Sequence, residues 1–337
     1  MTVVLGTARD DLLIDTDDGN IIFGDPYTEG NFHGFPGNGA ILSSGRGGND
    51  YIDGRDGVDY IVGDAAIIEG HAVGGDDYIL GGNGGHFGPE GSYEVLGGDA
   101  DTLMRDFARG GNDYLDGGEG VDYLVGDTFD MLDHARGGED HLVGGSDTDF
   151  LYGDADGTMK DHARGGNDFL EGGSGDDELR GDNGWNGITD HARGGNDTLD
   201  GGSGDDLLIG DGGIMSGHAM AGNDVLIGGL GNDRLYGDAD PLTSDLTHVR
   251  LGKDRFVFSD NCGRDIIFDF GNNDDVIDLT GFHGIHRFSE VRAYSRQSGD
   301  DVVIDLGAAA HGAHGANVVT LVDFALADLN AADFLFA

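Results

Sequence analysis

A short motif of glycines and an aspartate recurs along most of the chain, and this repetition constrains the fold more than any other feature. The motif RGGND, or a close variant of it, starts at residues 46, 73, 109, 136, 164, 193 and 220. A unit this short and this rich in glycine cannot bury its own apolar side chains. Consecutive units must therefore stack on one another, which predicts a solenoid.

Each period holds two copies of a smaller unit, a glycine-rich turn that ends in an acidic residue and leads into a short apolar strand. Within residues 109–126, for example, the segment DYL at 113–115 is followed by DYL at 122–124. Side chains alternate between the two faces of a strand, so the apolar residue two positions after each acidic residue should always face the core. The predicted core residues are Ile52, Ile61, Ile79, Leu96, Leu115, Leu124, Leu142, Leu151, Leu170, Leu179, Leu199, Leu208, Leu226 and Leu235.

These units resemble the RTX repeat, GGxGxDxUx, in which U is a large apolar residue. The clearest copies begin at Gly172, Gly201 and Gly228, and the resemblance extends through the repeats from Asp50 to Asp233. It implies an all-β protein: a parallel β-roll, an RTX solenoid, with loop insertions on one edge and a β-rich C-terminal cap. The change in sequence pattern after Asp240 divides the chain into residues 1–240, the calcium-binding β-roll, and residues 241–337, the cap.

The composition favours bound cations. The chain has 65 Asp or Glu against 18 Lys or Arg, a formal net charge of −47, and 67 glycines. Glycine-rich turns expose backbone carbonyls and the aspartates supply carboxylates, which are the oxygen ligands that Ca²⁺ prefers. Stacked coils would bring these carboxylates within about 4.8 Å of one another. We therefore expect that binding of multiple Ca²⁺ ions and folding are one event.

The resemblance assigns the metal-bridging role to the aspartate in the sixth position of the repeat. On the edge with tight turns these residues are Asp59, Asp122, Asp149, Asp177, Asp206 and Asp233. On the other edge, where an insertion precedes RGGND, the expected ligands are Asp50, Asp77, Asp113, Asp140, Asp168, Asp197 and Asp224, with Asp64, Asp127, Asp154, Asp182 and Asp211 as substitutes. Glu94 stands at the aspartate position of one tight turn and departs from the family pattern.

The insertions place a histidine just before Ala-x-Gly-Gly in most periods. These residues are His71, His134, His162, His191 and His218, with Phe107 at one of the positions. Stacked coils should arrange them as a ladder. A structural ladder is the favoured interpretation, and the alternative is a transition-metal site at His134, His162 and His191, because neutral imidazole binds such ions.

Aromatic residues often follow the acidic residue directly, at Tyr51, Tyr60, Tyr78, Tyr114, Tyr123, Phe150 and Phe169. They are predicted to form one outward-facing row. Cross-strand packing is the favoured interpretation. The alternative is stacking against sugar rings, which would make the protein a carbohydrate-binding module.

No catalytic motif is found: the sequence contains no HExxH zinc helix, no GxSxG nucleophile elbow and no phosphate-binding loop. The sequence thus favours a binding protein over an enzyme. A polysaccharide lyase or epimerase on a β-helix is an alternative by fold analogy, with positive groups at Arg105, Arg109, Arg136, Arg164 and Arg193. We expect these arginines to pair with nearby carboxylates instead.

The C-terminal segment predicts further strands and an end cap for the solenoid. It resembles the cap beside RTX repeats in serralysin-type secreted proteases, and residues 328–337 resemble a type I secretion signal. The resemblance implies a secreted, extracellular protein exported by the type I secretion apparatus. A structural or surface-associated role is expected, with an extracellular polysaccharide or a cell surface as candidate partners.

The negative charge makes nucleic acid and anionic membranes poor partners. No stretch approaches the roughly 18 apolar residues that a membrane span needs, and residues 1–7 do not read as a signal peptide. A single cysteine, Cys262, excludes an internal disulfide and is expected to be a small buried residue.

Overall fold

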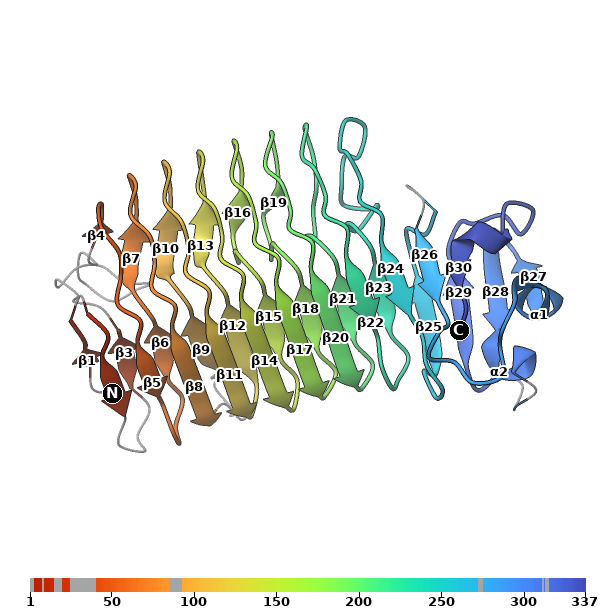
Figure 1. Cartoon of the computed structure of the whole chain (residues 1–337), viewed down its shortest axis with the longest axis horizontal. Coiled ribbons are helices and arrows are strands. Elements are labelled where there is room, and N and C mark those ends of the chain that lie inside the picture. Colours follow the sequence, from red (N-terminus) through yellow and green to blue (C-terminus); the bar gives the residue numbers. More distant parts are fainter. Residues whose placement is uncertain are drawn as a thin grey trace.

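The chain forms a long solenoid of stacked coils with a cap at its C-terminal end (Figure 1). The computed structural model describes residues 3–7, 9–14, 20–24, 41–84, 93–271, 275–310, 312 and 315–337. Among these residues the strands make three sheets that run along the solenoid, with 13, 11 and 6 strands, here named sheets 1, 2 and 3.

The strands of each sheet come from successive coils. In spatial order sheet 1 contains β1 (Val3–Leu5), β3 (Ile21–Phe23), β6 (Tyr60–Val62), β9 (Glu94–Gly97), β12 (Asp122–Val125), β15 (Phe150–Tyr152), β18 (Glu178–Arg180), β21 (Leu207–Ile209), β23 (Arg234–Tyr236), β25 (Arg264–Ile267), β29 (Val318–Leu321), β28 (Asp301–Asp305) and β27 (Ser295–Ser298). Sheet 2 contains β2 (Leu12–Ile14), β5 (Tyr51–Asp53), β8 (Tyr78–Asn83), β11 (Tyr114–Glu119), β14 (His141–Ser146), β17 (Phe169–Ser174), β20 (Thr198–Ser203), β22 (Val225–Ile227), β24 (Arg255–Val257), β26 (Val276–Asp278) and β30 (Phe334–Leu335). Sheet 3 contains β4 (Ile41–Leu42), β7 (Ala65–Ile68), β10 (Ala100–Met104), β13 (Thr128–Met131), β16 (Thr158–Met159) and β19 (Gly187–Ile188).

The all-β parallel β-roll that the repeats predict is confirmed. Equivalent residues of neighbouring coils lie in register, so that Leu115 pairs with Ile79 on one side and with Leu142 on the other. Every predicted core residue from Ile52 to Leu235 has a relative exposure of 0%. The apolar ladders of sheets 1 and 2 face each other and form one continuous core.

The insertions are not loops, as the sequence analysis expected, but the strands of sheet 3 and the turns that follow them. Their buried side chains form a second core of methionine, isoleucine and alanine, which includes Met104, Met131, Met159, Ile188 and Met215. Methionine and alanine are weak indicators of strands, and these strands are only two to five residues long. In-register stacking on neighbouring coils, rather than local propensity, therefore makes them strands.

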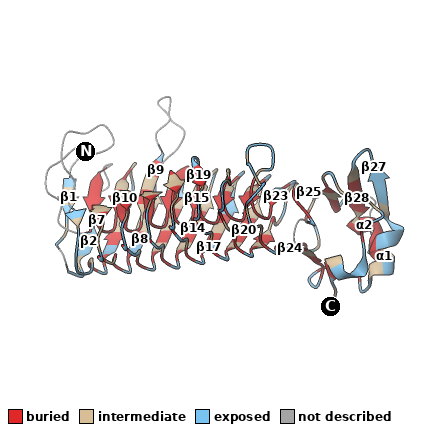
Figure 2. Ribbon diagram, turned by 90° about the horizontal axis from the view of Figure 1, so that it is seen from above, coloured by how far each residue is buried: buried red, intermediate tan, exposed pale blue. Residues whose placement is uncertain are grey.

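The cap closes the C-terminal end of the solenoid. Strands β27 and β28 extend sheet 1 in antiparallel fashion, and the helices α1 (Phe288–Ala293) and α2 (Leu306–Ala309) lie beside them, with a short 3₁₀ turn at Ala331–Asp333 (Figure 2). Sheets 1 and 2 continue across residue 240, because β25 pairs with β23 and β24 pairs with β22. The division at residue 240 thus remains a prediction.

Cys262 is buried, as expected. No helix among the described residues is long and apolar enough to cross a membrane.

Candidate metal centre

Aspartates on the tight edge form a buried column at the start of the sheet 1 strands. In most of them one carboxylate oxygen accepts the backbone N–H of the equivalent residue in the preceding coil, as in the bonds from Asp122 N to Asp149 Oδ1 (2.9 Å) and from Asp149 N to Asp177 Oδ1 (2.8 Å). The same bonds continue through Asp206 and Asp233 to Asp265, and Asp59 accepts from Asn20. The structure thus aligns every predicted residue of this edge and adds Asp265, which the sequence analysis missed because it follows no glycine-rich repeat.

A second column of aspartates lies on the opposite edge, where the chain enters the strands of sheet 2. Asp168 Oδ1 accepts from Asp140 N at 2.8 Å, and Asp197 Oδ1 accepts from Asp168 N at 2.8 Å. This pattern joins Asp50, Asp77, Asp113, Asp140, Asp168, Asp197 and Asp224 and continues to Asp254 and Asp275.

A third column lies on this same edge, where the chain leaves sheet 1. Its carboxylates accept from the second glycine of the next RGGND turn, as in the bonds from Gly166 N to Asp154 Oδ1 (2.8 Å) and from Gly195 N to Asp182 Oδ1 (2.6 Å). The column comprises Asp64, Asp99, Asp127, Asp154, Asp182, Asp211 and Asp238. The sequence analysis treated five of these residues as substitutes for the second column. The structure instead brings both columns together, and the Gly-Asp pair after each sheet 1 strand is the signal that would have identified Asp99 and Asp238.

Within the part of the chain that the structure describes, each column leaves carboxylate oxygens buried without a hydrogen-bond partner. On the tight edge these include Oδ2 of Asp149, Asp177, Asp206 and Asp233 and both oxygens of Asp122. On the other edge they include Oδ2 of Asp113, Asp140, Asp168, Asp197, Asp224, Asp154, Asp182 and Asp211. A buried carboxylate without a partner is costly, so this arrangement favours a cation between the coils.

The glycines of the turns leave room in which these oxygens converge with backbone carbonyls. A Cβ atom added to Gly172 would lie 2.6 Å from Asp177 Oδ2 and 2.7 Å from the carbonyl oxygen of Gly201. A carboxylate oxygen and a carbonyl oxygen therefore converge on the space that a side chain at this position would fill, and both are oxygen ligands of the kind that Ca²⁺ prefers. Among the described residues, no three or more His, Cys, Asp or Glu side chains are grouped so that they could hold a metal ion. Carbonyl oxygens of the turns lie beside the carboxylates, as at Gly172, and a set of oxygen ligands suits Ca²⁺.

Burial and mutual repulsion shift the carboxylates toward their protonated forms when no cation is bound. Burial, with the charges of Asp116 and Asp147, raises the pKa of Asp122 to about 7. Burial likewise raises the pKa of Asp149 to about 9 and that of Asp206 to about 7. These shifts measure how unfavourable the bare charges are inside the fold.

Glu94 occupies the aspartate position of the tight-edge column and pairs in register with Asp122. Burial and the charges of Asp122 and Asp59 raise its pKa to about 9, and both of its carboxylate oxygens are buried with no hydrogen-bond partner among the described residues. The departure from the family pattern thus keeps an acidic group inside the column.

Replacing Asp168 by asparagine is expected to destabilise the calcium-loaded protein by about 3 kcal/mol. The amide keeps the acceptor for Asp140 N but removes the negative charge from the buried oxygen. In saturating calcium, the midpoint of thermal unfolding should fall by about 4 °C. Asp300→Asn, on an exposed turn of the cap, is the matched control and should leave the midpoint unchanged. Equal midpoints for the two variants would contradict a ligand role for Asp168.

The histidines stack as the sequence predicts. Ring centroids are 5.0 Å apart between His134 and His162 and 5.2 Å apart between His162 and His191, and His248 extends the ladder beyond His218. Phe107 takes its place between His71 and His134. The transition-metal alternative at His134, His162 and His191 is unsupported, because the described residues contain no group of metal-binding side chains there.

The expectation that the arginines pair with carboxylates is wrong for most of them. Arg105 pairs with Glu69. In contrast, Arg109, Arg136, Arg164 and Arg193 are exposed and form no ion pair within the described part of the chain. The nearby aspartates turn inward into the columns, and the exposed corner beside these arginines carries mainly asparagines, such as Asn167 and Asn196, which bond to each other.

The aromatic residues do not form one row, contrary to the sequence analysis. Tyr51, Tyr78 and Tyr114 stack on sheet 2 with centroid distances of 5.4 and 4.6 Å. Tyr123 and Phe150 lie on sheet 1 instead. The two aspartates of each period introduce strands of different sheets, so the aromatic residues that follow them are separated as well.

Comparison with known proteins agrees with this geometry. The sequence profile of the RTX calcium-binding nonapeptide repeat, four copies long, matches residues 43–66, 107–130, 134–157, 162–189, 191–214 and 218–240. No curated protein sequence matches the chain. The crystal structure of the extracellular lipase LipA from Serratia marcescens matches with 16% identity and a TM-score of 0.26, over 65% of this chain and 45% of the lipase chain. The match thus spans less than half of the lipase, and its TM-score is too low to support an inference about this protein.

Proposed function

Because this chain is built on RTX calcium-binding nonapeptide repeats, we propose that it is a secreted protein whose solenoid folds when Ca²⁺ binds along its two acidic edges. The observation that carries the proposal is the set of stacked aspartates, such as Asp177 and Asp197, in which one oxygen accepts a backbone N–H and the other is buried without a hydrogen-bond partner among the described residues. On the tight edge the ligands would be Asp59, Asp122, Asp149, Asp177, Asp206 and Asp233. On the other edge both columns would contribute.

The electrostatics explain why folding should depend on calcium. The coils stack with carboxylate above carboxylate, and each aspartate raises the pKa of its neighbours, as Asp154, Asp197 and Asp140 do for Asp168 after the larger effect of burial. Bound calcium supplies the opposing charge. Without it, an ionised column must be removed from water and held together against its own repulsion. At neutral pH the calcium-free chain is therefore expected to be unfolded.

This dependence suits export. Extracellular calcium-binding modules typically bind in the range of about 10⁻⁴ to 10⁻³ M. A chain with such sites stays unfolded where calcium is scarce and folds where calcium is plentiful. The resemblance of residues 328–337 to a type I secretion signal supports the same route, with the cap closing the solenoid after export. A structural or surface-associated role would suit the elongated solenoid that forms after export.

A calcium titration followed by far-UV circular dichroism tests the proposal. Chelator-stripped protein should gain β-structure cooperatively at roughly 0.1 to 1 mM Ca²⁺. Mg²⁺ should have no such effect, because it requires near-octahedral geometry and keeps several of its waters. Stripped protein that already shows the full β-signal at pH 7.5 would contradict calcium-coupled folding.

A further inference from the structure

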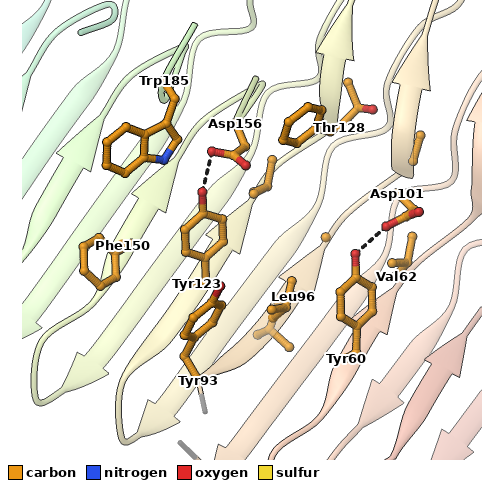
Figure 3. A pocket seen from close by; sticks show the side chains of 15 residues that line it. Tyr60, Val62, Tyr93, Leu96, Asp101, Tyr123, Thr128, Phe150, Asp156 and Trp185 are labelled. Atoms are coloured by element: carbon orange, nitrogen blue, oxygen red, sulfur yellow. Dashed lines mark hydrogen bonds between the residues drawn. The ribbon is translucent and has the colours of Figure 1, made fainter. Parts of the chain in front are cut away.

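A groove with a volume of about 430 Å³ lies between sheet 1 and sheet 3 (Figure 3). Sheet 1 contributes Tyr123 and Phe150, and the chain just before β9 contributes Tyr93. Asp101 comes from β10 of sheet 3, whereas Asp156 and Trp185 precede β16 and β19. We name this site the aromatic groove.

The groove exposes large aromatic rings that the fold does not cover. Trp185 is 58% exposed and Tyr93 is 48% exposed. Covering such rings would be favourable, so a concave surface that leaves them open is typical of a binding site. Tyr123 lies between Tyr93 and Phe150, with centroid distances of 5.7 and 6.1 Å. The rings therefore follow the groove across neighbouring coils.

The polar groups of the groove are few and are fixed in place. Asp101 accepts a hydrogen bond from the hydroxyl of Tyr60, and Asp156 accepts one from the hydroxyl of Tyr123 (Figure 3). Thr128 also lines the groove, is 1% exposed, and has a buried Oγ1 with no hydrogen-bond partner in the described structure. A buried hydroxyl without a partner is unfavourable unless a ligand supplies one.

The charges of the groove argue against an anionic ligand. The carboxylates of Asp101 and Asp156 line it and are negatively charged when ionised. The nearby cation, Arg180, is already engaged: it pairs with Glu178 at 2.6 Å and its guanidinium lies 5.5 Å from the centroid of the Trp185 ring. A carboxylated or sulfated polymer would therefore meet repulsion rather than an open positive group.

We propose that the aromatic groove binds a neutral saccharide. The C–H faces of pyranose rings stack on aromatic side chains, and their hydroxyls can donate to carboxylates and to Thr128 Oγ1. An aliphatic chain would use the rings but would leave Thr128 Oγ1 without a hydrogen-bond partner among the described residues. The neighbouring strands of sheet 1 are spaced by about 4.8 Å, so a groove that crosses several coils suits a linear chain of rings better than a single compact molecule.

The binding experiment uses the full chain in saturating calcium, so that saccharide binding and calcium-coupled folding are tested separately. Trp185 is the only tryptophan of the chain, and its fluorescence should change when the groove is filled. The probes are cellotriose, maltotriose and tri-N-acetylchitotriose, with trigalacturonate as an acidic and choline as a cationic comparison. A neutral glycan array, read by direct binding, extends the search to other linkages. At least one neutral saccharide should bind and change the fluorescence, and trigalacturonate should not.

The variants locate the binding site. Tyr123→Ala and Thr128→Val should each weaken saccharide binding, the former at least tenfold, measured by isothermal titration calorimetry. Tyr123→Phe keeps the ring and tests the phenol alone should Tyr123→Ala fold poorly. Tyr114→Ala is the matched control, since Tyr114 stacks on sheet 2 outside the groove, and its affinity should equal that of the unsubstituted protein. Absence of any neutral ligand, binding of choline or trigalacturonate alone, or equal losses in the Tyr114 and Tyr123 variants would overturn the proposal.

Discussion

Calcium-free protein is expected to regain β-structure when the pH is lowered from 8 to 5. Burial raises the folded-state pKa of Asp122 to about 7, of Asp149 to about 9 and of Asp177 to about 6, whereas aspartate in an unfolded chain has a pKa near 3.9. The folded state therefore binds more protons than the unfolded state between about pH 4 and pH 9. Protonation favours folding below the folded-state pKa values, and that stabilisation is lost as the pH rises through them.

The expected effect is large because many groups titrate together. Each carboxylate that is protonated only in the folded state contributes about 1.4 kcal/mol per pH unit. Far-UV circular dichroism of stripped protein between pH 8 and pH 5 measures the change, and light scattering at low protein concentration separates folding from association near the isoelectric point. With excess calcium the trend should reverse, because protons compete with calcium for the carboxylates. A stripped protein whose β-signal stays flat or falls on acidification would contradict this account of the columns.

Alanine at Gly153 is expected to destabilise the calcium-loaded protein by more than about 4 kcal/mol. The added Cβ would lie 1.8 Å from the carbonyl oxygen of Gly181 in the next coil and 2.4 Å from Asp168 Oδ2. Neither atom can move freely, since the coils are locked in register and Asp168 accepts from Asp140 N. The thermal midpoint in saturating calcium should fall by about 6 °C or more, and the calcium requirement for folding should rise.

Gly97→Ala is the control for this substitution. Gly97 is the last residue of β9 in sheet 1, whereas Gly153 directly follows β15 of that sheet, and a Cβ added to Gly97 would meet only Val62 Cγ2 at 3.8 Å and the Ile61 carbonyl oxygen at 3.9 Å. Alanine there should be neutral or should stabilise the protein by up to about 1 kcal/mol, since glycine inside a strand is unfavourable. Equal tolerance of alanine at both glycines would contradict the close approach of the Gly181 carbonyl oxygen and Asp168 Oδ2 to Gly153.

The sequence by itself determined the coil and its core. An acidic residue and an apolar residue two positions later recur in every period. Because side chains alternate along a strand, Leu115 and Leu142 lie on the same face of their strands, and that face must be the buried one. The same local pattern identified the aspartates of the first two columns within the repeats, but not Asp265, Asp254 and Asp275 beyond them. These inferences succeed because each depends on neighbours within a few residues and on the repetition of that unit.

Only the tertiary structure decided what the insertions do. Met104 and Met131 carry little local preference for strands, so sheet 3 appears only when coils are stacked in register. Stacking also brings the column of Asp154 against that of Asp168, and it separates Tyr114 from Tyr123 although both follow an aspartate. Such contacts join residues of different coils or different sheets, and their distances depend on how the chain turns between strands, which the periodicity of the sequence does not specify.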